Sequence, residues 1–164
     1  MDVESYARSF PTPPEGYSGL YIIRRNSIVG SALKKSLYVD GHYIGETATG
    51  TYFYRLVKPG VHKLQTESEF SENDVAHDFK EGENSFYQQY LKMGLFVGGA
   101  ALEKITQAET RSLMDDCTRA KDQDDKKKDL KNADYSEGMG SIPAPITKKD
   151  AEKIYGQTSS SSKP

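Results

Sequence analysis

Three histidines, His42, His62 and His77, are the first candidates for metal binding or general-base chemistry, because a neutral imidazole suits both roles. None has a second ligand at the short spacing typical of a zinc site, so we predict no metal and no cofactor. The Gly-x-Ser-x-Gly motif of one large hydrolase class is absent. His77 and Asp78 are adjacent on a predicted strand, where they would point to opposite faces of a sheet. We therefore predict no catalytic residue and expect a protein that is not an enzyme.

One enzyme alternative stays open, because two histidines could converge across a sheet. It is a small cell-wall hydrolase or metal-dependent enzyme with His62 or His77 as base or ligand. The single cysteine, Cys117, shares helical spacing with apolar residues, which favours an inert packed thiol over a nucleophile. The acidic stretch 67–74 lacks the glycine and the alternating ligands of a calcium loop, so we expect a solvated connection there.

Arg24 and Arg25 end a predicted strand over residues 19–25, and they are candidates to contact an anionic group of a partner. The chain as a whole carries a formal charge of −2, from 22 basic and 24 acidic residues. That balance provides no basic field for phosphate backbones, so we expect no nucleic-acid partner. No apolar run approaches the length of about 18 residues that a membrane helix needs.

Two turn signals organise the middle of the sequence. Asp40 and Gly41 separate two apolar runs and are typical of a two-residue hairpin loop, in which both residues take positive φ. Pro59 and Gly60 are the matching pair for a type II turn, and they predict a second hairpin. Between the turns lies a predicted strand over residues 51–57 in which apolar and aromatic side chains alternate.

Tyr52 and Tyr54 fall on one face of that strand, and we predict that this aromatic face meets a partner. If so, replacing either tyrosine with alanine would leave folding largely intact. A glycan would use exposed tyrosines as a stacking platform, so a sugar-binding module is a further alternative.

The spacing of strands and turns predicts a mainly β protein, an antiparallel β-sandwich of about seven to eight strands with a C-terminal helix. Thr106 and Glu109 form a capping box, and the helix is expected over residues 107–121. We divide the chain into a flexible proline-rich N-terminal tether (1–16), the sandwich with its closing helix (17–121) and a charged tail (122–164). The tail is expected to be largely disordered, with a short helix near 148–155.

Five segments together carry a family resemblance: 19–24, 36–46, 51–54, 58–64 and 102–103. Across residues 17–105 the chain resembles a bacterial domain family of unknown function, found largely in predicted lipoproteins of Gram-negative cells. The Val-Asp-Gly-x-x-Ile-Gly and Pro-Gly-x-His parts are similar to PEGA-type β-domains. These motifs are specific for a fold and assign no catalytic residue.

The resemblance implies a periplasmic protein anchored at the outer membrane through an N-terminal lipidated cysteine. No such cysteine precedes the domain in this sequence, so the anchor is expected to lie outside it. On this basis we expect a non-enzymatic adaptor or scaffold that binds another envelope protein, with a glycan as the alternative partner. The only membrane contact expected is through the anchor.

Overall fold

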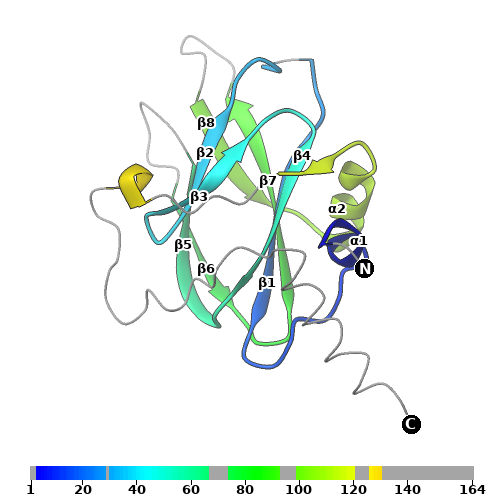
Figure 1. The fold of residues 1–164 in the computed structure, drawn as a ribbon, viewed down its shortest axis with the longest axis vertical. Coiled ribbons are helices and arrows are strands. Elements are labelled where there is room, and N and C mark those ends of the chain that lie inside the picture. The colour runs from blue at the N-terminus through cyan, green and yellow to red at the C-terminus, as the bar shows by residue number, and fades with distance from the viewer. Residues whose placement is uncertain (1–2, 29, 67–73, 93–98, 121–125, 131–164) are drawn as a thin grey trace.

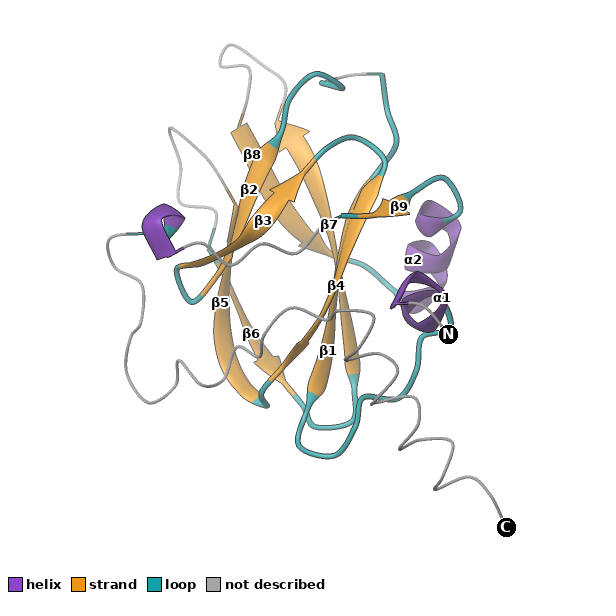
Figure 2. Ribbon diagram, viewed as in Figure 1, coloured by secondary structure: helices purple, strands orange, loops and turns teal. Residues whose placement is uncertain are grey.

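The structure is a computed structural model that describes residues 3–28, 30–66, 74–92, 99–120 and 126–130. Two β-sheets face each other, and two helices lie together against the outer face of one sheet (Figures 1 and 2). The predicted mainly β, sandwich-like fold is confirmed, and the described residues contain nine strands where seven to eight were expected. The elements are α1 (Val3–Arg8), β1 (Ser18–Arg24), β2 (Lys35–Val39), β3 (His42–Thr47), β4 (Thr51–Val57), β5 (Gly60–Thr66), β6 (Val75–Phe79), β7 (Asn84–Lys92), β8 (Gly99–Lys104), α2 (Gln107–Met114), β9 (Thr118–Arg119) and a short 3-10 helix, η1 (Lys126–Lys128).

The larger sheet has the strand order β8-β7-β1-β4-β9, and the smaller one has the order β3-β2-β5-β6. In the larger sheet β1 pairs antiparallel with β4 and parallel with β7. All seven residues of β1 are buried, as a central strand covered on both faces requires. Among the described helices, none has the length and apolar character needed to cross a membrane.

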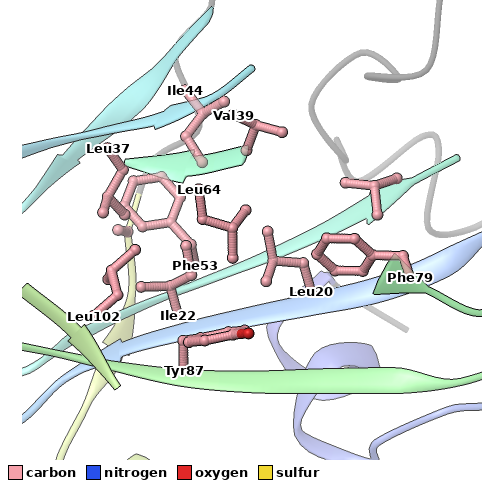
Figure 3. Close-up of a cluster of buried hydrophobic side chains, with 12 residues drawn as sticks. Leu20, Ile22, Leu37, Val39, Ile44, Phe53, Leu64, Phe79, Tyr87 and Leu102 are labelled. Atoms are coloured by element: carbon pink, nitrogen blue, oxygen red, sulfur yellow. The ribbon is translucent and has the colours of Figure 1, made fainter. Parts of the chain in front are cut away.

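The interior between the sheets is one apolar cluster to which both sheets contribute alternate residues (Figure 3). From the larger sheet, Leu20, Ile22 and Phe53 point into it, and Leu37 and Leu64 meet them from the smaller sheet. The same cluster also holds Val39, Ile44, Val57, Phe79, Tyr87, Leu102 and Ala120.

The outer face of the larger sheet is covered by α1 and α2, which creates a second, aromatic core. Tyr21, Tyr54 and Phe86 come from neighbouring strands, and Tyr6 and Met114 pack on them from the two helices. The rings of Tyr21 and Tyr54 have centroids 4.6 Å apart, and those of Tyr21 and Phe86 are 5.2 Å apart. Such close aromatic pairs bury large apolar areas.

The prediction that Tyr52 and Tyr54 form an exposed partner surface is wrong. Both side chains are 0% exposed, because α1, α2 and the turn that follows α2 cover this face of the sheet. The alternation along β4 correctly identified a shared aromatic face. It did not reveal that a second layer lies over that face.

The two predicted turns differ in what they connect. Asp40 and Gly41 take φ values of 50° and 82° and join β2 to β3 as the expected hairpin. Pro59 and Gly60 lie where β4 leads into β5, with Gly60 as the first residue of β5. The two strands belong to different sheets, so this turn is a crossover and the prediction of a second hairpin is wrong. Gly60 does take a positive φ, of 127°.

The N-terminal segment differs from the expected flexible tether. Tyr6 and Ala7 are buried, and the hydroxyl of Tyr21 donates to the Ala7 carbonyl at 2.7 Å. Arg8 donates to the carbonyls of Met114 and Cys117 at the end of α2. Residues 3–16 are therefore part of the domain, and they complete its second core.

The closing helix is shorter than predicted. The predicted Thr106 cap is confirmed, since Glu109 donates its backbone N–H to the Thr106 hydroxyl at 3.1 Å, while the Glu109 carboxylate accepts from the Thr106 hydroxyl and not from its backbone N–H. The helix ends at Met114, where two aspartates follow and the negative end of the helix dipole disfavours their charges. Ala120 then donates its N–H to the Tyr52 carbonyl, beyond the end of β9. The predicted helix near 148–155 and most of the predicted tail lie outside the described residues.

Replacing Tyr54 with alanine is expected to lower the free energy of unfolding by about 3–5 kcal/mol, because it removes a fully buried ring from the second core. Tyr90, which is 41% exposed, provides the control, and Tyr90→Ala is expected to cost less than about 1 kcal/mol. Urea unfolding of the three proteins measures both values. Equal losses in the two variants would contradict the assignment of Tyr54 to a core.

Candidate functional site

The candidate site begins with Arg24, the last residue of β1. Its side chain is only 4% exposed, and its guanidinium donates to the carbonyls of Thr47 at 3.0 Å and Gly30 at 2.8 Å. Burial lowers the pKa of Arg24, although a guanidinium stays charged at any physiological pH. Within the described part of the chain no carboxylate pairs with this charge, so only neutral carbonyl dipoles compensate it.

Arg24 and Arg25 both line a depression of about 200 Å³ at the end of the larger sheet. Because β1 and β7 run parallel, their carboxyl ends meet there, and Arg24 lies opposite Gln89. Arg25 is exposed, and no ion pair holds it among the described residues. The full lining consists of Arg24, Arg25, Ser27, Thr49, Gln88, Gln89, Tyr90 and Leu91.

Gly30 shapes this end of the sheet. It takes a φ of 70°, and a Cβ on it would lie 2.1 Å from the Leu91 side chain. Its carbonyl is also one of the two acceptors that hold Arg24. Glycine is favoured here because a side chain would be strained at this φ and would also require the end of the Leu91 side chain to move.

The side chains that line the depression differ in whether hydrogen bonds within the domain already engage them. Gln89 is engaged in the interior, where its amide donates to the Thr66 hydroxyl at 2.6 Å and its carbonyl oxygen accepts from Thr47. Gln88 has no hydrogen bond from its amide among the described residues, and Tyr90 is exposed. Arg25, Gln88 and Tyr90 are therefore the side chains available to a ligand.

Arg24 and Arg25 were predicted from the sequence, but the contribution of β7 to the site was not. The parallel pairing of β1 with a strand about sixty residues later leaves no local signal in the sequence. The polar pair at 88–89, which interrupts the run of apolar and aromatic residues in β7, was the available hint. Of the four predicted partner residues, the structure brings the two arginines together and places Tyr52 and Tyr54 in a core.

His62 forms a structural ion pair beneath the first hairpin. Its Nδ1 donates to the Asp40 carboxylate at 2.6 Å and its Nε2 donates to the Lys58 carbonyl at 2.8 Å. Both acceptors require a proton on the ring nitrogen that faces them, so the imidazole is positively charged. Burial alone lowers the pKa of His62, but the hydrogen bonds to Asp40 and Lys58 outweigh it and raise that pKa.

His77 lies opposite His62 in the sheet, and it links β6 to β7. Its Nδ1 is 2.7 Å from the Tyr87 hydroxyl and its Nε2 is 2.8 Å from the Ser85 hydroxyl. Burial lowers the pKa of His77, and the charge of Lys104 lowers it further, which favours the neutral ring. Ser85 and Tyr87 are both buried, so this network ties the two sheets together.

His42 is tied to a segment that follows the closing helix. Its Nδ1 lies 3.1 Å from the Asp129 carboxylate, and the same carboxylate accepts the Tyr43 N–H at 2.9 Å. Leu130 donates its N–H to the Gly41 carbonyl. Residues 129–130 thereby bind along β3, an edge strand of the smaller sheet.

The remaining chemical candidates are structural where they are described. Cys117 is buried in the second core, and burial raises the pKa of its thiol. Across the described ranges no three histidine, cysteine or acidic side chains gather as a metal site would require. Most of the acidic stretch lies outside the described residues. Asp74, at its end, accepts a hydrogen bond from Gln65.

Comparisons with known proteins identify a family without a function. A family model described as "Protein of unknown function (DUF2846)" matches residues 14–100, which contain β1 to β7 and the whole lining of the depression. An uncharacterized protein of Haemophilus influenzae is 47% identical over 109 residues, covering 66% of this chain and 64% of that protein. The chain thus spans less than two thirds of that relative's length. No solved structure matches the chain.

Replacing Asp40 with asparagine is expected to change how stability depends on pH. The folded pKa of His62 is raised, so its contribution is complete below the unfolded value of about 6.5 and is lost as pH rises through the folded pKa. Asparagine suits the positive φ of the turn but removes the negative charge.

The test measures the free energy of unfolding of both proteins by urea titration at pH values below and above about 6.5. The wild-type advantage over Asp40→Asn should shrink as pH rises above about 6.5. Because His77 is present in both proteins, its own titration cancels in the difference. An advantage that stays constant or grows with pH would show that the pair is not an aspartate–imidazolium pair.

Proposed function

We propose a non-enzymatic binding role for this chain, which belongs to the DUF2846 family of proteins of unknown function. In this proposal the domain is the folded part of an envelope protein, and it serves as an adaptor or scaffold for another envelope component. The binding surface is the end of the larger sheet, where β1 and β7 finish.

The observation that carries this proposal is the charge of Arg24. A buried guanidinium with only carbonyl acceptors among the described residues favours an approaching anion, since burial of an unpaired charge costs free energy. Arg25 adds a second, exposed guanidinium to the same depression. Two arginines that line one depression suit the capture of one anionic group.

The size of the depression supports a partner more than a small substrate. Its volume of about 200 Å³ is below the range of about 300–1,000 Å³ that holds whole small molecules. A hollow of this size accommodates one side chain or group of a larger molecule. The Tyr90 ring at its border is the kind of residue that contributes most to interface affinity.

The enzyme alternative has less support. It needed His62 or His77 as a base or ligand, and both nitrogens of each ring face partners within the domain. Neither histidine lines the depression. The glycan alternative needed several exposed tyrosines. Within the described ranges Tyr90 is exposed, and every other tyrosine is buried or partly buried.

The envelope location rests on the family resemblance. Because Tyr6 and Ala7 pack in the second core, the segment 3–16 is not the flexible tether of the first interpretation.

Reversing the charge of Arg25 is expected to weaken partner capture by about tenfold or more, because it places a carboxylate where the anionic group binds. The measurement is co-purification after chemical crosslinking in the native cell, quantified by mass spectrometry for Arg25→Glu against wild type. Lys80→Glu is the matched control, since Lys80 is exposed near the start of β7, at the other end of that strand. Capture that falls equally in both variants, or in neither, would rule out this surface.

A further inference from the structure

We propose that the depression recognises a side-chain carboxylate of a partner protein, on a segment in which an aspartate or glutamate adjoins an apolar residue. This inference rests on the proposed binding function and specifies the chemistry of its ligand. It follows from the hydrogen-bond donors that remain free at the site, and from the apolar side chains that border it.

Arg24 is held in place before any ligand arrives. Its two bonds, to the Gly30 and Thr47 carbonyls, use two of the five N–H donors of the guanidinium. The group is therefore oriented at little further entropic cost, and its charge remains to be balanced. A preorganised charge of this kind increases affinity without new ordering on binding.

Arg25 and Gln88 supply donors that nothing else in the described chain engages. A free guanidinium presents a planar fork that matches the two oxygens of a carboxylate. An amide next to it can donate to the same group. Together with Arg24 these side chains favour an oxygen anion over a neutral ligand.

The apolar side chains at the site favour a protein over a saccharide. Tyr90 and Leu91 both line the depression, and Tyr90 is 41% exposed. An aliphatic side chain such as that of Leu91 has no hydrogen bond to offer a sugar, whereas an apolar peptide residue packs on both side chains.

The test is an NMR titration of the full chain with two short peptides, Gly-Ser-Glu-Leu-Phe-Gly-Ser and its counterpart with glutamine in place of glutamate. The signals to follow are the side-chain N–H groups of Arg25 and Gln88 and the backbone amide of Tyr90. Inorganic phosphate is titrated separately as a simple anion. Arg25→Gln tests the site and Lys80→Gln is the control, while Arg24 is left intact because it also holds the fold.

The expected result is binding of the glutamate peptide with a Kd at least about tenfold lower than that of the glutamine peptide, as a charge-assisted hydrogen bond predicts. Arg25→Gln should remove that difference and Lys80→Gln should keep it. Equal binding of both peptides, or shifts at other surfaces, would overturn the inference. Phosphate that binds as tightly as the glutamate peptide would also overturn it, since the site would then select any anion.

If neither peptide binds, the carboxylate inference is wrong, but this result does not decide the proposed function. In that case a loss of partner capture in Arg25→Glu would still support binding at this surface. If capture falls equally in Arg25→Glu and Lys80→Glu, or in neither, the proposed binding surface and the carboxylate inference are both wrong.

Discussion

The burial of the larger sheet on both faces is the constraint on which the rest of this structure depends. Its central strand, β1, sends Leu20 and Ile22 into the space between the sheets and sends Tyr21 and Ile23 under the two helices. An edge strand or a half-exposed sheet would not need α1, and the N-terminal segment could then be a tether. Because both faces need cover, the segments on either side of the sandwich become part of the domain.

The same constraint locates the candidate site. The helices on the outer face bury Phe86, near the start of β7, while Tyr90 on the same face farther along is exposed. Polar and charged residues follow where β1 and β7 end, and Arg24 and Arg25 both line the depression there. The Arg24 side chain is buried, and that of Arg25 is exposed. The proposed binding role uses both charges at one depression, with the Arg24 guanidinium held by two carbonyls and the Arg25 guanidinium exposed.

Local signals in the sequence were sufficient where one short segment decides the structure. The Asp40–Gly41 hairpin and the Thr106 cap depend on neighbouring residues, and both were predicted. The turn at Pro59 was recognised as a turn, but turn chemistry cannot specify which sheet the next strand joins. The prediction that Tyr52 and Tyr54 of β4 are exposed was wrong for a related reason. Alternation assigns residues to a face of the sheet, but it does not say what covers that face.

The candidate site was only half predictable for the same physical reason. Two adjacent arginines at a strand end are visible in the sequence, but the burial of the first depends on Gly30 and Thr47, from two other segments. The residues from β7 join the site through a parallel, long-range pairing. The histidines were candidates because an imidazole can bind a metal or act as a base. In the structure, His62 and His77 instead stabilise contacts between strands and sheets.

Site-specific photo-crosslinking in living cells tests the central claim most directly. A photoreactive residue would replace Tyr90 at the depression, and in a second protein it would replace Val61, which is exposed on the smaller sheet. The account predicts that position 90 captures one dominant protein through an acidic segment and that position 61 does not. Capture of the same protein from both positions, or of glycan alone from position 90, would contradict it.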